Sequence, residues 1–466
     1  MPKKAKKIED LLFKPATFWE SASRQEIHSA MDFCDGYKQF LNEAKTERQV
    51  IAASIKLASK EGFKEVSLDE DLGKNRKLIF VNRAKALAMV DLGEHNLNSG
   101  VKILLAHVDA PHLDLKVRPL YEDSGIAYFK PHYYGGIKKY HWPTTPLAMS
   151  GMVVLKNGEE IEINIGGKKD EPVFLISDLL PHLEKERLDK PFDKAIEAEE
   201  LNIIVGSIPV SGKKTQERVK LAVLAWLSEH YRIKEVDLLA ADIRFVPAYE
   251  ARDVGLDKSM IGGYGQDDRV CVYTTLRAFL ASKDKGVKIL YLADKEEIGS
   301  VGTTGAESLW LENVVDYLLK QTKSNISLYD LFRKSWAISA DVTAAFDPDY
   351  KSAYDKNNSA ELGKGAVIEK YLGYKGKYMT VDAEPKYLRH LMDLFDKKRV
   401  VWQTGHLGKV DQGGGSTIAV YLANRNLEVV DLGVPLLNMH APYELSSKAD
   451  VYSAYKGYRV FLEGPL

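Results

Sequence analysis

Short apolar runs alternate with longer amphipathic stretches along this chain of 466 residues. An apolar run of about four to eight residues predicts a buried strand, whereas apolar residues spaced three and four apart predict a helix. The four clearest apolar runs are Val101–Ala106, Val287–Ala293, Trp336–Ala340 and Leu427–Val434. Helix-like stretches accompany them at Val270–Ala281, Ala306–Lys320 and Glu384–Phe395. This rhythm predicts an α/β fold with a doubly wound, mainly parallel sheet.

The middle of the chain, from Asp114 to about Glu250, breaks this rhythm. It opens with an aromatic-rich stretch, Tyr128–Trp142, that we expect to be irregular. Asn157-Gly158 then separates two β-rich runs within Met152–Ile165, and Asn-Gly at such a point is a strong hairpin signal. Helices are expected at Asp178–Arg187 and Arg218–Tyr231. We therefore expect residues 114–250 to form an inserted β-rich domain, and residues 1–113 and 251–466 to form the main domain.

Composition narrows the class of protein. Lys and Arg number 65 and Asp and Glu number 66, which removes any bulk electrostatic attraction to nucleic acid or to an anionic membrane. The two cysteines, Cys34 and Cys271, are too few for a disulfide framework or a thiolate metal cluster, and a reducing cytoplasm fits this. No apolar stretch approaches the roughly 18 residues of a membrane span. The basic start of the chain runs at once into acidic residues, unlike a signal peptide.

Two adjacent carboxylates, Glu296 and Glu297, follow the buried run Val287–Ala293, where the small-residue turn Gly299–Ala306 begins. Adjacent negative charges at such a point are costly unless a positive group lies between them. Ligands of open α/β folds gather at the carboxyl ends of the strands. The pair therefore indicates a binding or catalytic site.

Other polar residues stand at the ends of the remaining runs. His107 and Asp109 follow Val101–Ala106, Asp341 follows Trp336–Ala340, His440 follows the run that begins at Leu427, and Asp267 closes a glycine-rich turn. Each has an ordinary alternative when taken alone. His107 can be a buried histidine satisfied by Asp109, Asp267 a helix cap, Asp341 a turn former and His440 a loop residue. Their repeated position at one edge of one sheet favours a shared site.

The chemistry of the set suits a divalent metal. Two imidazoles and three carboxylates favour zinc over copper(I) or iron–sulfur clusters, which prefer thiolates. Five protein ligands exceed the roughly three that one catalytic zinc takes from protein, whereas two metals sharing one carboxylate would use all five. Paired metals can clamp a water and polarise a carbonyl. One residue of the Glu296–Glu297 pair would then bind metal and the other would move protons, and spacing leaves open which does which.

At this point the motifs resemble the M18 metallopeptidases, a family that includes aspartyl aminopeptidase. The matching segments, spread through nearly the whole chain, are His107–Pro111, Asp267-Asp268, Asp294–Ser300, Ser339–Asp341, Gly363–Gly365 and Leu437–Ala441. The resemblance implies a dinuclear zinc aminopeptidase that removes N-terminal residues from peptides. It implies two Zn²⁺ per subunit, with Mn²⁺ or Co²⁺ as alternatives.

The resemblance also implies a role for each residue. His107 and His440 would bind one zinc each, Asp267 would bridge, Glu297 and Asp341 would complete the two coordination spheres, Glu296 would be the general base and Asp109 would orient a ligand. Lys364 and the loop Gly413–Thr417, with Gly414 and Gly415, would lie on the substrate side. His182 would reach a neighbouring subunit's site. Family members form dodecamers, so the inserted domain would act in dimerisation or as a lid.

Two positions depart from the family pattern. Asp268 stands where Asn is expected, and Ile137–Pro146 lacks the Asp-Arg-Asp of the eukaryotic enzymes, which bears on side-chain preference more than on chemistry. A lysine at Lys364 would favour an acidic first residue, although a lysine in a glycine turn is equally often plain surface.

Two further functions stay open at the level of sequence. A dinuclear zinc amidohydrolase acting on N-acylated amino acids could use the same metal set, and a noncatalytic oligomeric scaffold could retain structural metal. The expected partners are peptide substrates and further copies of the chain in a homo-oligomer, with neither nucleic acid nor membrane, and the expected location is cytoplasmic.

Overall fold

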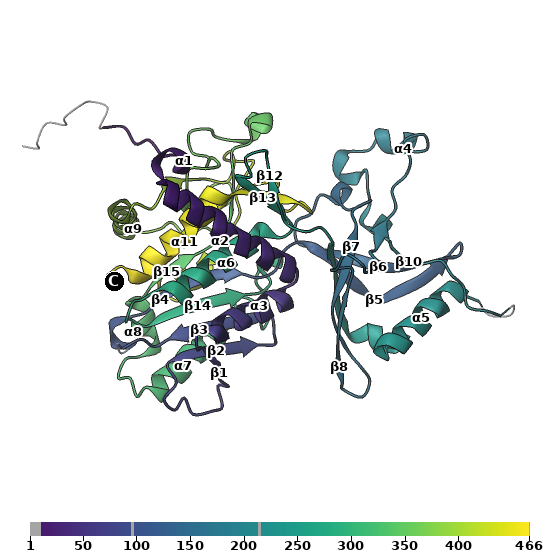
Figure 1. The fold of residues 1–466 in the computed structure, drawn as a ribbon, viewed down its shortest axis with the longest axis horizontal. Helices are drawn as coiled ribbons and strands as arrows, with labels where there is room; N and C mark the ends of the chain where they lie inside the picture. The colour runs from purple at the N-terminus through teal and green to yellow at the C-terminus, as the bar shows by residue number, and fades with distance from the viewer. Residues whose placement is uncertain (1–10, 95–96, 213–215, 466) are drawn as a thin grey trace, which may run out of the picture.

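The described residues form three sheets of nine, seven and five strands. The structure, a computed structural model, describes residues 11–94, 97–212 and 216–465, so the basic start of the chain lies outside it. Figure 1 shows one body that holds the nine-stranded central sheet, with the seven-stranded second sheet extending to its right. The five-stranded third sheet lies above the central one, near the junction.

The four apolar runs form four neighbouring strands of the central sheet, all parallel to one another. The pairs β2–β3, β3–β14 and β17–β19 are antiparallel, so the sheet is mixed rather than parallel throughout. In spatial order its strands are β1 (Lys64–Glu65), β2 (Lys77–Asn82), β3 (Ala86–Asp91), β14 (Lys288–Ala293), β4 (Lys102–His107), β15 (Trp336–Ser339), β19 (Glu428–Gly433), β17 (Ala366–Glu369) and β18 (Trp402–Thr404).

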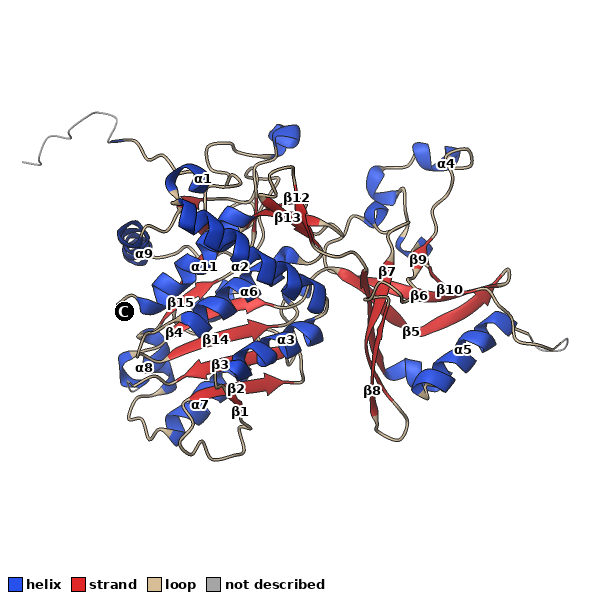
Figure 2. Cartoon of the chain, viewed as in Figure 1, coloured by secondary structure: helices blue, strands red, loops and turns tan. Residues whose placement is uncertain are grey.

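Helices cover both faces of the central sheet (Figure 2). Neighbouring strand residues point to opposite faces, so Leu290 and Leu292 pack into one core while Ile289 and Tyr291 pack into the other. The first core is closed by α2 (Arg24–Glu43), α3 (Glu47–Lys60), α6 (Gln266–Ala281), α9 (Pro385–Lys398) and α11 (Lys448–Glu463). The second is closed by α7 (Trp310–Gln321), α8 (Leu328–Arg333) and α10 (Ala419–Asn424).

The parallel register brings the polar strand ends to one edge. Ala293 of β14 pairs with His107 of β4, and Ser339 of β15 pairs with Leu105. The residues that follow β14 and β15 therefore emerge beside His107. This places the segments carrying Glu296 and Asp341 at a common rim, as parallel strands require.

The second sheet is antiparallel and has a core of its own. Its strands, in spatial order, are β8 (Glu160–Ile165), β7 (Leu147–Val154), β11 (Ala241–Pro247), β5 (His112–Asp123), β6 (Ile126–Tyr134), β10 (Ile203–Gly206) and β9 (Leu175–Ile176). The hairpin predicted at Asn157-Gly158 is confirmed as β7–β8. The helix predicted at Arg218–Tyr231 is confirmed as α5, which packs on this core.

Two predictions for this region are wrong. The start of Tyr128–Trp142 is regular, because Ile126–Tyr134 is strand β6, paired with β5 along much of its length. Of the helix expected at Asp178–Arg187, only the short α4 (Lys185–Leu188) forms. Pro181 has no N–H to donate and opposes a helix through the segment's middle.

The third sheet carries two further site segments. Its strands, in spatial order, are β12 (Arg252–Val254), β13 (Met260–Gly263), β21 (Glu444–Ser447), β20 (Pro435–Leu437) and β16 (Thr343–Ala344). β13 leads into Asp267 at the start of α6, and β20 leads into His440. The expectation that His440 follows a central strand is corrected here, because β19 ends at Gly433 and β20 belongs to a different sheet. The helices of the described residues include none long and apolar enough to cross a membrane.

Truncating a side chain in the centre of the sheet should destabilise the protein strongly. Leu290 is fully buried in β14, and Leu290→Ala removes a packed side chain and leaves a cavity, at a cost of about 2–5 kcal/mol. Leu309→Ala is the matched control because Leu309 is 69% exposed, and it should change stability by less than about 0.5 kcal/mol. Urea unfolding midpoints would measure the difference, and equal midpoints would contradict the packing described.

Candidate metal centre

His107, at the end of β4, faces two carboxylates from different elements. Its Nε2 lies 3.2 Å from Oδ1 of Asp267 and 3.7 Å from Oδ1 of Asp341. All three side chains are buried, and their ligand atoms, with one from Asp268, fall within 4.8 Å of one another. This first group joins the ends of β4 and β15 to the start of α6.

A second group shares Asp267 with the first. Nε2 of His440 lies 3.1 Å from Oδ2 of Asp267 and 3.6 Å from Oε1 of Glu297. Asp267 thus directs one oxygen at each histidine. The side chain of His440 is 35% exposed, so this group lies nearer to solvent than the first. The five predicted ligands are brought together, as two overlapping groups around one carboxylate.

The hydrogen bonds of the two histidines fit a cation in each group. Nδ1 of His107 faces Asp109 at 3.2 Å, and Nδ1 of His440 faces the Gly136 carbonyl at 2.8 Å. Both partners are acceptors, so Nδ1 carries the proton in each ring. A neutral ring then directs the Nε2 lone pair at carboxylate oxygens, an arrangement that is repulsive unless a proton or a metal ion lies between.

The distances and the unpaired oxygens also fit metal. Nitrogen and oxygen ligands of a tetrahedral zinc about 2 Å away lie about 3.3 Å apart. The observed Nε2–Oδ distances of 3.2 and 3.1 Å match that spacing. Oε1 of Glu297 is buried and has no hydrogen-bond partner among the residues that the structure describes. The donor set, imidazole and carboxylate without thiolate, is one that zinc accepts.

The pKa shifts of the cluster also indicate a site for a positive ion. Burial raises the pKa of Glu297 well above its ordinary value, and nearby Asp267 raises it further. Burial likewise raises the pKa of Asp341. Burial lowers the pKa of His440, but the hydrogen bond with Asp267 outweighs it and the pKa rises to about 10. Without metal the cluster therefore binds protons tightly, as buried acidic groups do when they lack a compensating positive charge.

Asp109 fixes the geometry around His107. Its Oδ1 contacts Nδ1 of His107 and accepts the N–H of Glu296 at 3.1 Å. Its Oδ2 accepts the N–H of Glu297 at 3.1 Å and the hydroxyl of Tyr134 at 2.8 Å. Burial acts to raise the pKa of Asp109, but the hydrogen bond with His107 lowers it overall. Asp109 lies where an orienting carboxylate is expected, beside a candidate ligand.

Glu296 lies beside the cluster without belonging to either metal-ligand group. Burial raises the pKa of its carboxyl to about 8, which nearby His107 acts to lower and Asp341 to raise. The preceding residue, Lys295, adopts a left-handed conformation with φ of 69°, and this turn directs the two neighbouring glutamates into the site. A carboxyl with a pKa near neutrality can both accept and return a proton.

Sequence reasoning missed several supporting residues. Glu444 accepts the N–H of Asp267 at 3.1 Å and of His440 at 2.8 Å, so it ties the two segments of the second group together. Asp268, noted only as a departure from Asn, accepts the N–H of His107 at 3.3 Å and is fully buried. The contacts of Tyr134 and Gly136 were also missed. A glycine pair directly after a strand, Gly135-Gly136, was the available signal, since it often marks a close approach of backbone to another group.

Two of the predicted substrate-side residues, Lys364 and His182, lie in different parts of the fold. Lys364 forms an ion pair with Glu361 at 2.7 Å, in a turn whose Gly363 and Gly365 N–H groups are both held by Asp450. His182 is exposed in the region of the second sheet.

The predicted glycine loop makes contacts of its own. Gly414 adopts a φ of 110° against the Gly373 carbonyl, whereas Gly415 has open space where a Cβ would lie. Thr417, at the end of the loop, donates its hydroxyl to Asp431 at 2.7 Å.

Comparison with known proteins gives a consistent match. Residues 40–462 match the family described as aminopeptidase I zinc metalloprotease (M18). A probable M18 family aminopeptidase 1 from Clostridium acetobutylicum is 44% identical over 464 residues, covering 97% of this chain and 99% of that protein.

Solved structures agree. The crystal structure of an M18 family aminopeptidase from Thermotoga maritima has a TM-score of 0.92 at 41% identity, covering 97% of this chain and 100% of that one. The mApe1 dodecamer of Saccharomyces cerevisiae has a TM-score of 0.76 at 20% identity, covering 93% and 96%, which shows likeness of fold alone.

Asp450, which accepts the N–H groups of the turn that carries Lys364, should make the free energy of unfolding depend on pH. Burial raises the pKa of Asp450 from 3.8 to about 8, although the N–H groups of Gly363 and Gly365 act to lower it. A carboxyl that holds its proton more tightly when folded stabilises the fold at low pH, and this contribution is lost as pH rises toward about 8. The free energy of unfolding should therefore fall more steeply between pH 4 and 8 in the wild type than in Asp450→Asn. Equal slopes in urea unfolding across a pH series would contradict this.

Proposed function

The chain belongs to the M18 family of zinc metallopeptidases, and on this premise we propose that it removes the N-terminal residue of peptides at a two-zinc centre. The observation that carries the proposal is Asp267, whose two oxygens face the Nε2 atoms of His107 and His440. A carboxylate shared in this way fits a site for two neighbouring ions. As a member of this family the protein is a metallo-aminopeptidase, a hydrolase of peptide bonds.

The two groups suggest how the ligands divide. We propose that His107 and Asp341 hold one zinc, that Glu297 and His440 hold the other, and that Asp267 bridges them. When bound, the ions would polarise the substrate carbonyl and lower the pKa of the attacking water. Mn²⁺ and Co²⁺ accept the same nitrogen and oxygen donors.

Glu296 is the proposed general base. It lies in the turn that follows β14, and burial gives its carboxyl a pKa of about 8. It would accept a proton from the attacking water and deliver it to the leaving amine. Asp109 would keep the His107 ring oriented and hold the backbone of both glutamates through their N–H groups.

The substrate side of the proposal rests on family likeness. Lys364 would favour an acidic first residue, and Gly414 and Gly415 would let the backbone approach the peptide. His182 would reach the site of a neighbouring subunit in a homo-oligomer, for which the dodecameric mApe1 is the precedent. Residues 114–250 would form the domain that makes subunit contacts or covers the site, with 1–113 and 251–466 as the catalytic domain. A cytoplasmic location fits two buried free cysteines.

The two other functions are not favoured by the comparisons. The relatives reported above are named aminopeptidases, which favours free peptide amines over N-acylated amino acids as substrates. A noncatalytic scaffold leaves the buried Glu296, outside both ligand groups, without a purpose.

Glu296→Gln and Glu297→Gln should separate the two roles of the pair. Glu296→Gln should bind zinc as the wild type does, and kcat should fall by about 10²- to 10⁴-fold because the general base is lost. Glu297→Gln should weaken zinc binding because a charged ligand is replaced by a neutral one. Each variant is the control for the other. Zinc titration and peptide hydrolysis would be measured on both, and loss of zinc from Glu296→Gln would contradict the assignment.

Substrate class can be tested directly. Aminoacyl chromogenic substrates should be hydrolysed, and a chelator should abolish the activity until zinc is restored. Acidic first residues should be favoured, with Lys364→Gln losing that preference and little of the activity on neutral residues, because an opposite charge is removed. Cleavage of N-acylated substrates alone would support the amidohydrolase instead. Hydrolysis that survives complete chelation would exclude a metal mechanism.

A further inference from the structure

One strip of the second sheet touches both halves of the candidate metal centre. The strip is Tyr134–Gly136, at the end of β6. Tyr134 donates its hydroxyl to Asp109, which holds His107. Gly136 offers its carbonyl to Nδ1 of His440 at 2.8 Å. Both histidines are therefore oriented, directly or through one carboxylate, by three consecutive residues that come from outside the central sheet.

The two glycines of the strip lie close enough to the site that an added side chain would crowd its ligands. A Cβ on Gly135 would lie 3.0 Å from Oε2 of Glu297, and φ of 73° there already favours glycine. A Cβ on Gly136 would lie 3.2 Å from Nδ1 of His440. The backbone of the strip thus packs closely against Glu297 and His440 and leaves little room for a Cβ atom.

Tyr134 is itself held in position. Its ring stacks on His112 with centroids 4.3 Å apart and planes 17° apart. His112 is fixed from both ring nitrogens, by the Ala110 carbonyl at 2.8 Å and by Asp114 at 3.0 Å. Since Ala110 and His112 lie one and three residues after Asp109 in the chain, this packing joins the tyrosine to the segment that it orients.

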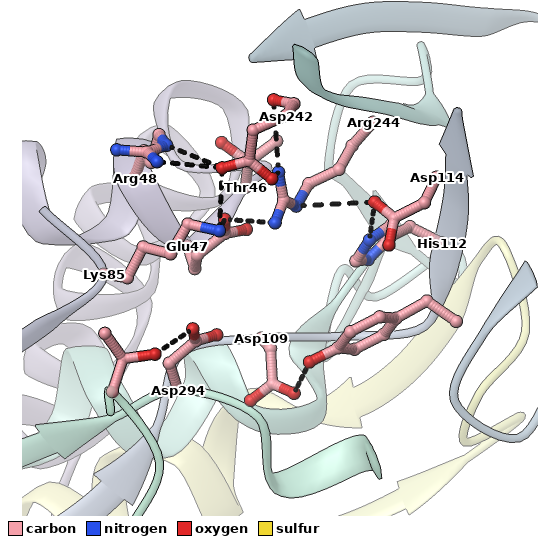
Figure 3. Close-up of polar contacts among 12 residues, drawn as sticks. Thr46, Glu47, Arg48, Lys85, Asp109, His112, Asp114, Asp242, Arg244 and Asp294 are labelled. Carbon is pink, nitrogen blue, oxygen red and sulfur yellow. Dashed lines mark hydrogen bonds and ion pairs between the residues drawn. The ribbon is translucent and has the colours of Figure 1, made fainter. Parts of the chain in front are cut away.

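A charged network near His112 and Asp114 joins the second sheet to α3 and to Lys85, which belong to the part of the chain that holds the central sheet (Figure 3). Arg244 of β11 contacts Glu47, the first residue of α3, at 2.7 Å, and Asp242 of β11 contacts Lys85 at 2.7 Å and Arg48 at 2.8 Å. Arg244 and Glu47 are almost completely buried. Separating these buried charged groups would leave charges unpaired, which is costly, so the network resists a different placement of the second sheet.

We propose that Tyr134–Gly136 is the positioning element for both metal-ligand histidines, so that zinc affinity depends on how the second sheet is seated. Tyr134 is a positioning residue: it orients Asp109, and Asp109 orients His107. Gly136 orients His440 by fixing the proton on Nδ1. The second sheet is then part of the metal centre in addition to any role in subunit contacts. This inference rests on the proposed two-zinc site.

Tyr134→Phe is the sharpest test, because it removes one hydroxyl and keeps the ring on His112. The zinc dissociation constant, measured by chelator competition, should rise about 10- to 100-fold, the usual effect of losing a group that orients a ligand. Tyr133→Phe is the matched control, since Tyr133 is the preceding residue of the same strand and is 40% exposed. It should bind zinc as the wild type does. The visible spectrum of the cobalt-loaded protein should change in Tyr134→Phe and stay unchanged in Tyr133→Phe.

A second pair of variants tests the other histidine. Gly136→Ala crowds Nδ1 of His440 and should also weaken zinc binding, whereas Gly167→Ala meets no atom within 4 Å and should not. Thermal midpoints of the metal-free proteins should be the same within each pair, which separates positioning from loss of fold. If Tyr134→Phe binds zinc as tightly as Tyr133→Phe, or if its weaker binding only follows a lower metal-free midpoint, the inference is wrong. A wild type that binds no zinc would instead overturn the proposed function.

Discussion

The carboxylate of Asp109 accepts two contacts on each oxygen, and the arrangement of the candidate metal centre depends on it. Through these contacts the end of β4 is joined to the turn after β14 and to the end of β6. A buried carboxylate whose acceptor positions are filled in this way resists displacement, because any shift exposes an unsatisfied charge to a medium of low polarity. The placement of His107, Glu296 and Glu297 follows from this one group.

Burying the acidic side chains of the site destabilises the folded protein, and the rest of the fold offsets this. Five acidic side chains, those of Asp267, Asp268, Glu297, Asp341 and Glu444, are buried or nearly buried close together. Burial acts to raise the pKa of all five, and the pKa is raised overall in all except Asp267, where the contacts with two histidines outweigh burial. The large apolar cores on the two faces of the central sheet supply the stability that such a cluster lacks. The usual preference for exposed charged side chains is broken here, as is common at functional sites.

Much of the central sheet and of the candidate site could be predicted from sequence. The physical reasons for this also explain which predictions were wrong. Val287–Ala293 predicts a buried strand because its residues are apolar on both faces, and the residues after such a strand must lie at the sheet edge. That reasoning brought Glu296, His107 and Asp341 together correctly. The same reasoning wrongly placed the strand before His440 in the central sheet, whereas that strand, β20, belongs to the third sheet. Gly433, whose Cβ would meet the Asp341 carbonyl at 1.5 Å, ends β19 and lets the chain cross to the third sheet. The roles of Tyr134 and Glu444 were beyond local patterns, since each acts through a partner distant in sequence. The glycine pair Gly135-Gly136 signals a close approach of the backbone, but the sequence does not say to which group.

The distance along the chain between His107 and His440 has a consequence for biosynthesis. A growing polypeptide carries His107, Asp267 and Asp341 before it carries His440 and Glu444, which lie just after β20 and at the start of β21. Domains form as their residues emerge from the ribosome, so the centre is completed among the last steps. A centre of the kind proposed, which needs His440 as a ligand, therefore becomes complete only when nearly the whole chain has been made.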